Sequence, residues 1–186
     1  KEAYILKIIR KLANKNSVGV DGISSRVIKA ASSVLVTPIT YIVNSSISSG
    51  VFPTSWRTAK VIPILKKGDP KVMSNYRPVS LLPITSKILE EVVRSQISSH
   101  FEKNNLLPQS QHGFRPMHST TSALLALQRR LEVASGNKDY TAMLLFDLSA
   151  AFDTLDHAIF LQKLAVYGVD ERGRRWFQSY LESRKQ

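Results

Sequence analysis

The chain has 186 residues, of which 43 % are hydrophobic and 22 % are charged, a composition typical of folded globular proteins. Lysine and arginine number 26 against 14 acidic residues, which gives a net charge of +12. This excess favours an anionic partner, with nucleic acid ahead of an anionic membrane surface. Cysteine is absent, which excludes a disulfide framework and a thiolate zinc site. No apolar run approaches the ~20 residues of a membrane-spanning helix, so no membrane partner is expected.

The first third of the sequence predicts helices. Apolar residues at helical spacing predict one helix from Ala3 to Leu12. The turn residues of Gly19–Gly22 interrupt the chain, and a longer helical pattern follows from Arg26 to about Ser48. Pro38 is expected to kink this second helix or to divide it in two, and Gly50 to end it.

Two short apolar segments, residues 59–65 and 77–82, flank a loop rich in turn residues and predict an antiparallel hairpin with a basic tip. Lys66 and Lys67 lie on one arm of this hairpin and Arg77 on the other. Two converging cations can bind a triphosphate, since arginine donates two parallel hydrogen bonds and lysine supplies a point charge. A solvated basic turn that binds no ligand is the alternative.

The rest of the chain predicts a mixed helical and stranded fold with no internal repeat. The expected elements are a helix over 86–101, a loop over 104–118, a helix over 119–134, a strand over 140–146, and helices over 156–167 and 171–183. The strand is nearly all apolar, which is typical of a strand buried on both faces. Asp147 follows it, and a carboxylate at such a strand end can project into a ligand cleft. Alternatively, Asp147 only ends the strand.

A third feature is the segment Gln111–Arg115, which precedes a helix start. Gly113 allows close approach of the backbone, and Arg115 beside a helix N-terminus suits a phosphate backbone. The alternative is a simple helix-entry loop in which Ser119 is the N-cap.

These features occur in one order along the chain and resemble the reverse transcriptases of non-long-terminal-repeat (LINE-type) retrotransposons. The blocks that carry the resemblance are Trp56–Asp69, Asn75–Leu82, Gln111–Arg115 and Phe146–Asp153, with Val20–Ile23 similar to the extension that precedes the fingers. The resemblance implies an α+β fold, namely right-hand polymerase fingers plus an incomplete palm. It implies an N-terminal helical extension over 1–55, fingers over 56–139 and a partial palm over 140–186.

The resemblance also implies an activity and assigns roles to residues. The activity is RNA-directed DNA polymerisation, with an RNA template, a DNA primer, deoxynucleoside triphosphates and two Mg²⁺ ions. Asp147 would be the catalytic, metal-binding aspartate, assisted by the backbone carbonyl of Leu148. The triphosphate would be held by Lys66, Lys67 and Arg77, Ala150 and Ala151 would leave room beside the nucleotide, and Phe152 would exclude a 2′-hydroxyl. Arg115, Lys29 and Lys60 would contact nucleic acid.

One departure from the family limits these expectations. The family's second palm motif, an aromatic residue followed by X-Asp-Asp, has no counterpart, because no Asp-Asp pair occurs in the sequence. We therefore expect the chain to be a fragment that cannot polymerise DNA alone. The resemblance also implies that the protein acts in the nucleus or cytoplasm. The second hypothesis is a non-catalytic nucleic-acid-binding remnant of such a domain. The third is an unrelated two-metal nuclease using Asp147, Asp153 and Asp156.

Overall fold

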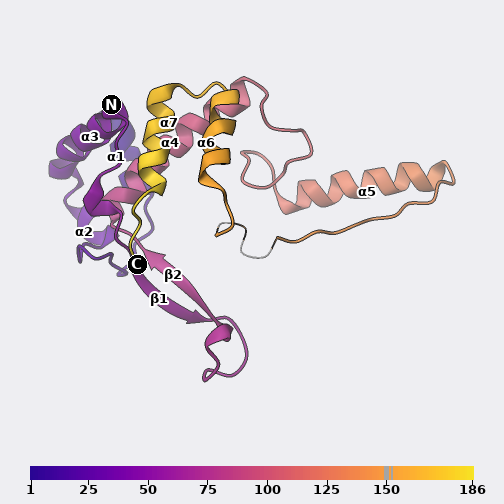
Figure 1. Ribbon diagram of the computed structural model, residues 1–186, viewed down its shortest axis with the longest axis horizontal. Coiled ribbons are helices and arrows are strands. Elements are labelled where there is room, and N and C mark those ends of the chain that lie inside the picture. Colours follow the sequence, from indigo (N-terminus) through magenta and orange to yellow (C-terminus); the bar gives the residue numbers. More distant parts are fainter. Residues whose placement is uncertain (149–150, 152) are drawn as a thin grey trace. The chain divides into compact units, whose positions relative to one another are not determined.

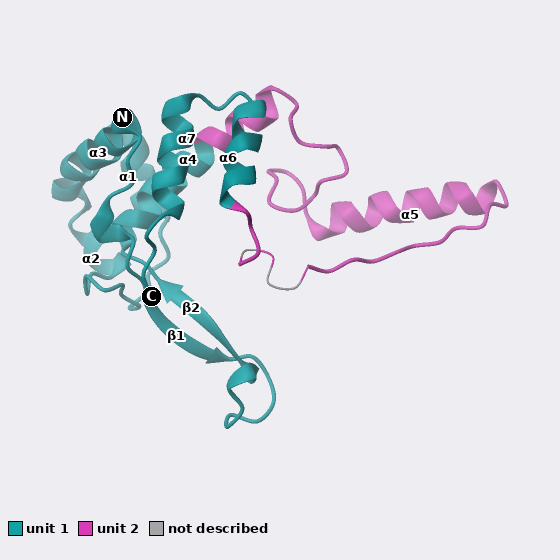
Figure 2. Ribbon diagram, in the orientation of Figure 1, with its two compact units in different colours: residues 1–95, 157–186 teal, residues 96–156 magenta. Residues whose placement is uncertain are grey.

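The structure, a computed structural model, describes residues 1–148, 151 and 153–186. They form two compact units, residues 1–95 with 157–186 and residues 96–156 (Figure 2). The first unit contains α1 (Glu2–Lys11), α2 (Ser25–Ala30), α3 (Ser32–Ser49), η1 (Thr54–Trp56), β1 (Lys60–Leu65), η2 (Met73–Asn75), β2 (Tyr76–Leu81), α6 (His157–Val166), α7 (Glu171–Leu181) and most of α4 (Ile84–Lys103); the second contains the end of α4 and α5 (Thr120–Gly136). The expected mixture of helix and strand is confirmed.

The N-terminal helices largely follow the sequence pattern. Ile5, Ile8 and Ile9 of α1 are buried, which confirms the predicted helix and its apolar face. The second predicted helix is divided, but the division falls at Ala31, so the expectation that Pro38 divides it is wrong. Ala31 leaves helical geometry with φ −92° and ψ 14°, whereas Pro38 lies within α3 on its exposed side. There water can reach the carbonyl that the missing proline N–H leaves unpaired.

The core of the first unit joins α1, α3, α4 and α7. Phe52 is completely buried, and its ring makes edge contacts with Trp176 at 5.7 Å and with Tyr180 at 5.1 Å between centroids. Trp176 Nε1 donates to Ser46 Oγ at 2.9 Å, and Ser46 Oγ donates to the Val51 carbonyl at 2.6 Å. This chain of hydrogen bonds satisfies the buried polar atoms and holds α7 against α3. Among the described residues, no helix combines the length and apolar character needed to cross a bilayer.

The predicted hairpin is confirmed as an antiparallel pair of β1 and β2 that extends from the helices (Figure 1). Pro63 lies opposite Pro78 in the register. Both prolines are tolerated because, within the described residues, each strand has a free edge. After β2 the chain passes close to Gly19, where a Cβ atom would lie 2.7 Å from the backbone nitrogen of Pro83. Only glycine fits this approach without a shift of the backbone.

The described part of the second unit contains the end of α4, a long loop and α5. Ser119 is the N-cap of α5 and forms a capping box with Ser122, as the helix-entry alternative predicts. The predicted strand over 140–146 is wrong for this structure: these residues have no strand assignment, and Leu144, Leu145 and Phe146 are 80 %, 84 % and 88 % exposed. A strand buried on both faces needs neighbouring strands, and within the described residues only β1 and β2 form a sheet.

Candidate functional site

The register of the hairpin decides which of its cations share a face. Opposite residues of an antiparallel pair project to the same side, and alternate residues of one strand share a side. Ile64 pairs with Arg77, so Arg77 shares its face with Ile64 and Lys60. Lys66 follows two residues after Ile64, and its backbone N–H donates to the Asn75 carbonyl at 2.8 Å. Strand alternation continued one residue beyond β1 would place Lys66 beside Arg77 at the tip end of this face, and Lys60 lies at the far end of it.

The loop at the tip of the hairpin is held by its own polar groups. Asn75 Nδ2 donates to the Asp69 carbonyl and Tyr76 OH donates to the Pro70 carbonyl, both at 2.9 Å. Gly68 has φ +86°, and a Cβ atom there would lie 2.7 Å from Asn75 Nδ2. These contacts fix the turn. They leave the predicted triphosphate-binding cations Lys66, Lys67 and Arg77 exposed.

A set of contacts at the base of the hairpin, the joint formed by Arg57, Ser179 and Lys185, was not predicted from the sequence. Arg57 Nη2 donates to Ser179 Oγ at 2.8 Å and to the Phe52 carbonyl at 3.3 Å. The Lys185 carbonyl accepts from Ala59 N–H at 2.9 Å, and Lys185 N–H donates to the Arg57 carbonyl at 3.2 Å. Arg57 does lie in a block that carries the family resemblance. Nothing in the sequence pattern, however, indicates a partner 122 residues later.

Beside this joint lies a partly buried group of titratable side chains. Burial raises the pKa of Glu90, although the hydrogen bond from Ser86 and the charge of Arg184 oppose the shift. Ser86 Oγ donates to Glu90 Oε1 at 2.7 Å. Burial also raises the pKa of Tyr180, whose ring lies 4.0 Å from the guanidinium carbon of Arg184. Ionising Glu90 therefore carries a desolvation penalty.

Two lysines predicted to contact nucleic acid have different surroundings. Lys60 is exposed at the start of β1. Lys29 is half-buried, and its Nζ donates to the carbonyl of Leu12, the C-cap of α1, at 2.8 Å. A cation at a helix C-terminus stabilises the helix, so Lys29 has a structural contact in addition to its predicted role. Both assignments stay predictions.

Arg115 is held by an acidic partner within the second unit. Its Nε and Nη2 atoms each lie 3.0 Å from an oxygen of Glu102, and Nη1 donates to the Pro108 carbonyl at 3.0 Å. The Arg115 side chain is only 14 % exposed. This two-pronged ion pair ties the loop to the end of α4. A role for Arg115 with nucleic acid stays a prediction, and it would require the guanidinium to keep or exchange this partner.

The predicted catalytic segment is solvent-exposed. Asp147 and Leu148 are exposed and lie in no strand, so Asp147 is not at the end of a buried strand as expected. Ala151 is also exposed. Ala150 and Phe152, predicted to adjoin the incoming nucleotide, lie outside the described residues.

The described residues do not by themselves form the two-ion Mg²⁺ site that the resemblance implies. Mg²⁺ bound by protein needs carboxylates in near-octahedral geometry, and no group of three histidine, aspartate or glutamate side chains that could hold a metal occurs in the described part. Asp153 and Asp156 belong to that part and do not join Asp147 in such a group. The structure thus does not assemble the nuclease site of the third hypothesis.

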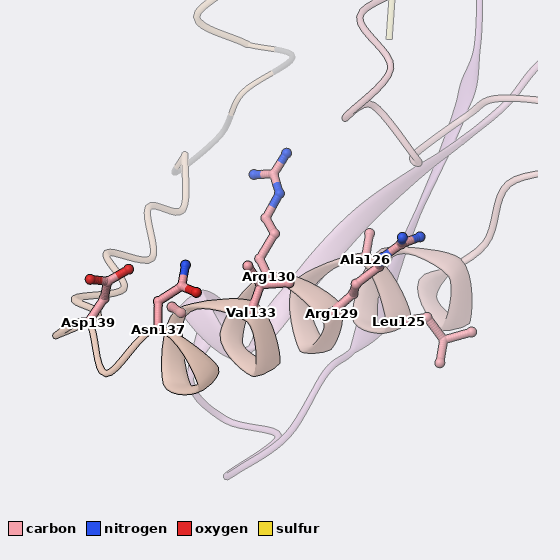
Figure 3. A pocket seen from close by; sticks show the side chains of 8 residues that line it. Leu125, Ala126, Arg129, Arg130, Val133, Asn137 and Asp139 are labelled. Carbon is pink, nitrogen blue, oxygen red and sulfur yellow. The ribbon is translucent and has the colours of Figure 1, made fainter.

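A shallow pocket of about 650 Å³ lies along α5 within the second unit. Figure 3 shows Arg130 extending from the middle of the helix and Asn137 and Asp139 near its C-terminal end. No residue of α5 is buried, so the pocket is an open surface beside a solvated helix and not an enclosed binding site.

Comparisons with known proteins give a consistent result. Residues 64–186 match the family described as "Reverse transcriptase (RNA-dependent DNA polymerase)". The "Probable RNA-directed DNA polymerase from transposon BS" of Drosophila melanogaster is 29 % identical over 188 residues, which cover 97 % of this chain and 20 % of the relative.

Two further relatives from Drosophila melanogaster extend this pattern. The "Probable RNA-directed DNA polymerase from transposon X-element" is 30 % identical over 97 % of this chain and 20 % of its own length. The "RNA-directed DNA polymerase from mobile element jockey" is 31 % identical over 86 % of this chain and 18 % of its own length. The chain thus spans about a fifth of the length of these relatives.

Proposed function

Because this chain belongs to the reverse transcriptase (RNA-dependent DNA polymerase) family, we propose that it forms part of the RNA-directed DNA polymerase of a non-LTR retrotransposon. In that enzyme it would bind the incoming deoxynucleoside triphosphate and contact the RNA template and DNA primer. The proposed substructures are an N-terminal helical extension, fingers that include the hairpin, and part of a palm. The net charge of +12 suits polyanionic partners.

The hairpin is the observation that carries this proposal. Arg77 lies opposite Ile64, Lys66 follows two residues after Ile64, both cations are exposed, and the tip loop is fixed by Asn75 without using either side chain. Nucleotide addition depends mainly on positioning and charge neutralisation of phosphates. A rigid turn that presents an arginine beside a lysine supplies both, with Lys67 adjacent in the same turn.

Asp147 is the proposed catalytic carboxylate. It lies within the region that matches the family and it is exposed to solvent. We also propose that Leu148 lies beside the metal and that Ala151 lies beside the nucleotide. Asp147 belongs to no metal-binding group of three carboxylate or histidine side chains among the described residues, so its proposed role depends on its place in the family motif.

The test uses primer extension on an RNA template by the polymerase that carries this chain. Arg77→Ala should raise the KM for deoxynucleoside triphosphate about tenfold or more, because it removes charge-assisted hydrogen bonds of roughly 1.5–3 kcal/mol. Arg10→Ala is the matched control, since it makes the same chemical change at an exposed arginine of α1 that has no proposed ligand contact. It should change that KM by less than about twofold.

The outcomes separate the two leading hypotheses. Equal effects of Arg77→Ala and Arg10→Ala would contradict a specific triphosphate site on the hairpin. Salt-sensitive RNA binding by the wild-type protein without any extension would instead support the non-catalytic nucleic-acid-binding hypothesis.

A further inference from the structure

The base of the hairpin is fastened to the C-terminal part of the chain by two separate sets of contacts. The first is made by side chains: Ser179 Oγ of α7 accepts both from Arg57 Nη2 at 2.8 Å and from Phe52 N–H at 2.9 Å. One hydroxyl oxygen therefore holds the residues at both ends of η1. Arg57 completes the joint by also donating to the Phe52 carbonyl at 3.3 Å.

The second set of contacts is made by backbone and rings. Lys185 pairs with the chain just before β1, through the Ala59 N–H and the Arg57 carbonyl, and Figure 1 shows the C-terminus at the base of the hairpin. Arg184 Nε donates to the Tyr180 carbonyl at 2.7 Å. Its guanidinium carbon lies 5.0 Å from the centre of the Phe52 ring. Residues 184–185 are thereby held against α7 and the start of β1.

This fastening matters for the direction in which the hairpin leaves the core. The sheet has only two strands, so the direction of the hairpin is set where it leaves the core. The six residues of β1 span roughly 20 Å, and this length separates the base of the hairpin from the cations Lys66 and Arg77 near its tip. By the same strand geometry, a tilt of about 10° at the base would move those cations by roughly 3 Å.

The joint also contains a destabilising feature, so a contribution to stability alone does not explain it. Arg57 Nε is buried and has no hydrogen-bond partner among the described residues. A buried donor without a partner destabilises the folded state. In return, the Arg57 guanidinium reaches both the Ser179 hydroxyl and the Phe52 carbonyl from one nitrogen.

We propose that Arg57 and Ser179 are positioning residues that set the direction of the hairpin and so place Lys66 and Arg77 for triphosphate binding. The inference deepens the proposed function and rests on the hairpin being the triphosphate site. Neither residue contacts the nucleotide; each acts through the orientation of β1.

The test measures binding of a fluorophore-labelled deoxyadenosine triphosphate to the 186-residue chain, together with amide hydrogen exchange in β1 and β2. Ser179→Ala removes the acceptor of two hydrogen bonds and should weaken triphosphate binding about fivefold, because the hairpin then populates less of the direction that places both cations on the triphosphate. It should also speed exchange in the hairpin. Ser179→Thr keeps the hydroxyl and should restore both. Ser45→Ala, at an exposed serine of α3, is the matched control and should change neither.

An Arg77→Ala arm separates this inference from the proposed function. If Arg77→Ala leaves triphosphate affinity unchanged, the hairpin is not the triphosphate site and both ideas fail. If Arg77→Ala weakens binding while Ser179→Ala equals wild type in affinity and exchange, only the positioning role is overturned. Should Ser179→Ala fail to fold by circular dichroism, Arg57→Lys replaces it, because lysine keeps the charge but lacks the planar guanidinium whose Nη2 atom reaches both acceptors. Wild-type affinity in that variant would then overturn the inference.

Discussion

A substitution of Phe52 tests the packing of the first unit most directly. Phe52 is completely buried, and its ring meets the edges or faces of Trp56, Trp176 and Tyr180 at 5.1–6.3 Å between centroids. Phe52→Ala removes the ring and leaves its three aromatic neighbours facing a cavity. Phe114→Ala makes the same chemical change at a side chain that is 100 % exposed, and it is the matched control.

The size of the effect follows from the buried area. A buried phenylalanine removes about 200 Å² from water, which at about 25 cal/mol per Å² corresponds to about 5 kcal/mol. Alanine retains part of that area, so we expect Phe52→Ala to lower the free energy of unfolding by about 3–5 kcal/mol. Phe114→Ala should change it by less than about 0.5 kcal/mol, because the ring buries nothing.

Urea unfolding followed by tryptophan fluorescence measures both values. The chain has two tryptophans, and both contact Phe52, so the signal reports on this cluster. A thermal midpoint lowered by about 10 °C is the corresponding expectation. A loss below about 1 kcal/mol for Phe52→Ala, or an equal loss for Phe114→Ala, would refute this account of the core.

The adjacent carboxylates Glu90 and Glu91 should respond oppositely to neutralisation. Burial raises the folded-state pKa of Glu90, so Glu90→Gln should stabilise the protein at neutral pH, and the gain should vanish as the pH falls below the ordinary carboxyl pKa. The hydrogen bond from Arg94 lowers the pKa of Glu91, so Glu91→Gln should destabilise at neutral pH, with the loss disappearing as the pH falls through the lowered pKa. Urea unfolding at neutral and acidic pH tests both signs, and shifts in the same direction would contradict the assignment. For the ion pair of Arg115 with Glu102, a double-mutant cycle of Arg115→Ala and Glu102→Gln should give a coupling of about 1 kcal/mol. A coupling of zero would show that the pair does not hold the loop.

The elements that could be predicted from the sequence are those whose signals are local. The hairpin follows from two apolar segments around Gly68 and Asn75, and α5 follows from Ser119 as its N-cap. Local signals of this kind need no knowledge of distant partners. The prediction that Pro38 divides the helix failed because an exposed proline can remain within a helix when water reaches the unpaired carbonyl.

The features that the sequence could not predict depend on distant parts of the chain. Arg57 and Ser179 meet across 122 residues, and nothing in the spacing of either residue signals the other. The apolar run before Asp147 does signal a buried strand, but burial needs partner strands that the described residues do not provide. Likewise, the positive charge of Arg115 indicated a phosphate contact, while the structure pairs it with Glu102.

The central claim is that this chain contributes catalytic residues to an RNA-directed DNA polymerase. The most direct test is primer extension on an RNA template by the polymerase that carries this chain, with Asp147→Asn and, as matched control, Asp139→Asn, another exposed aspartate of the same unit. The account predicts that Asp147→Asn abolishes extension while RNA affinity is retained, and that Asp139→Asn extends at the wild-type rate. Extension by Asp147→Asn at the wild-type rate would contradict the account.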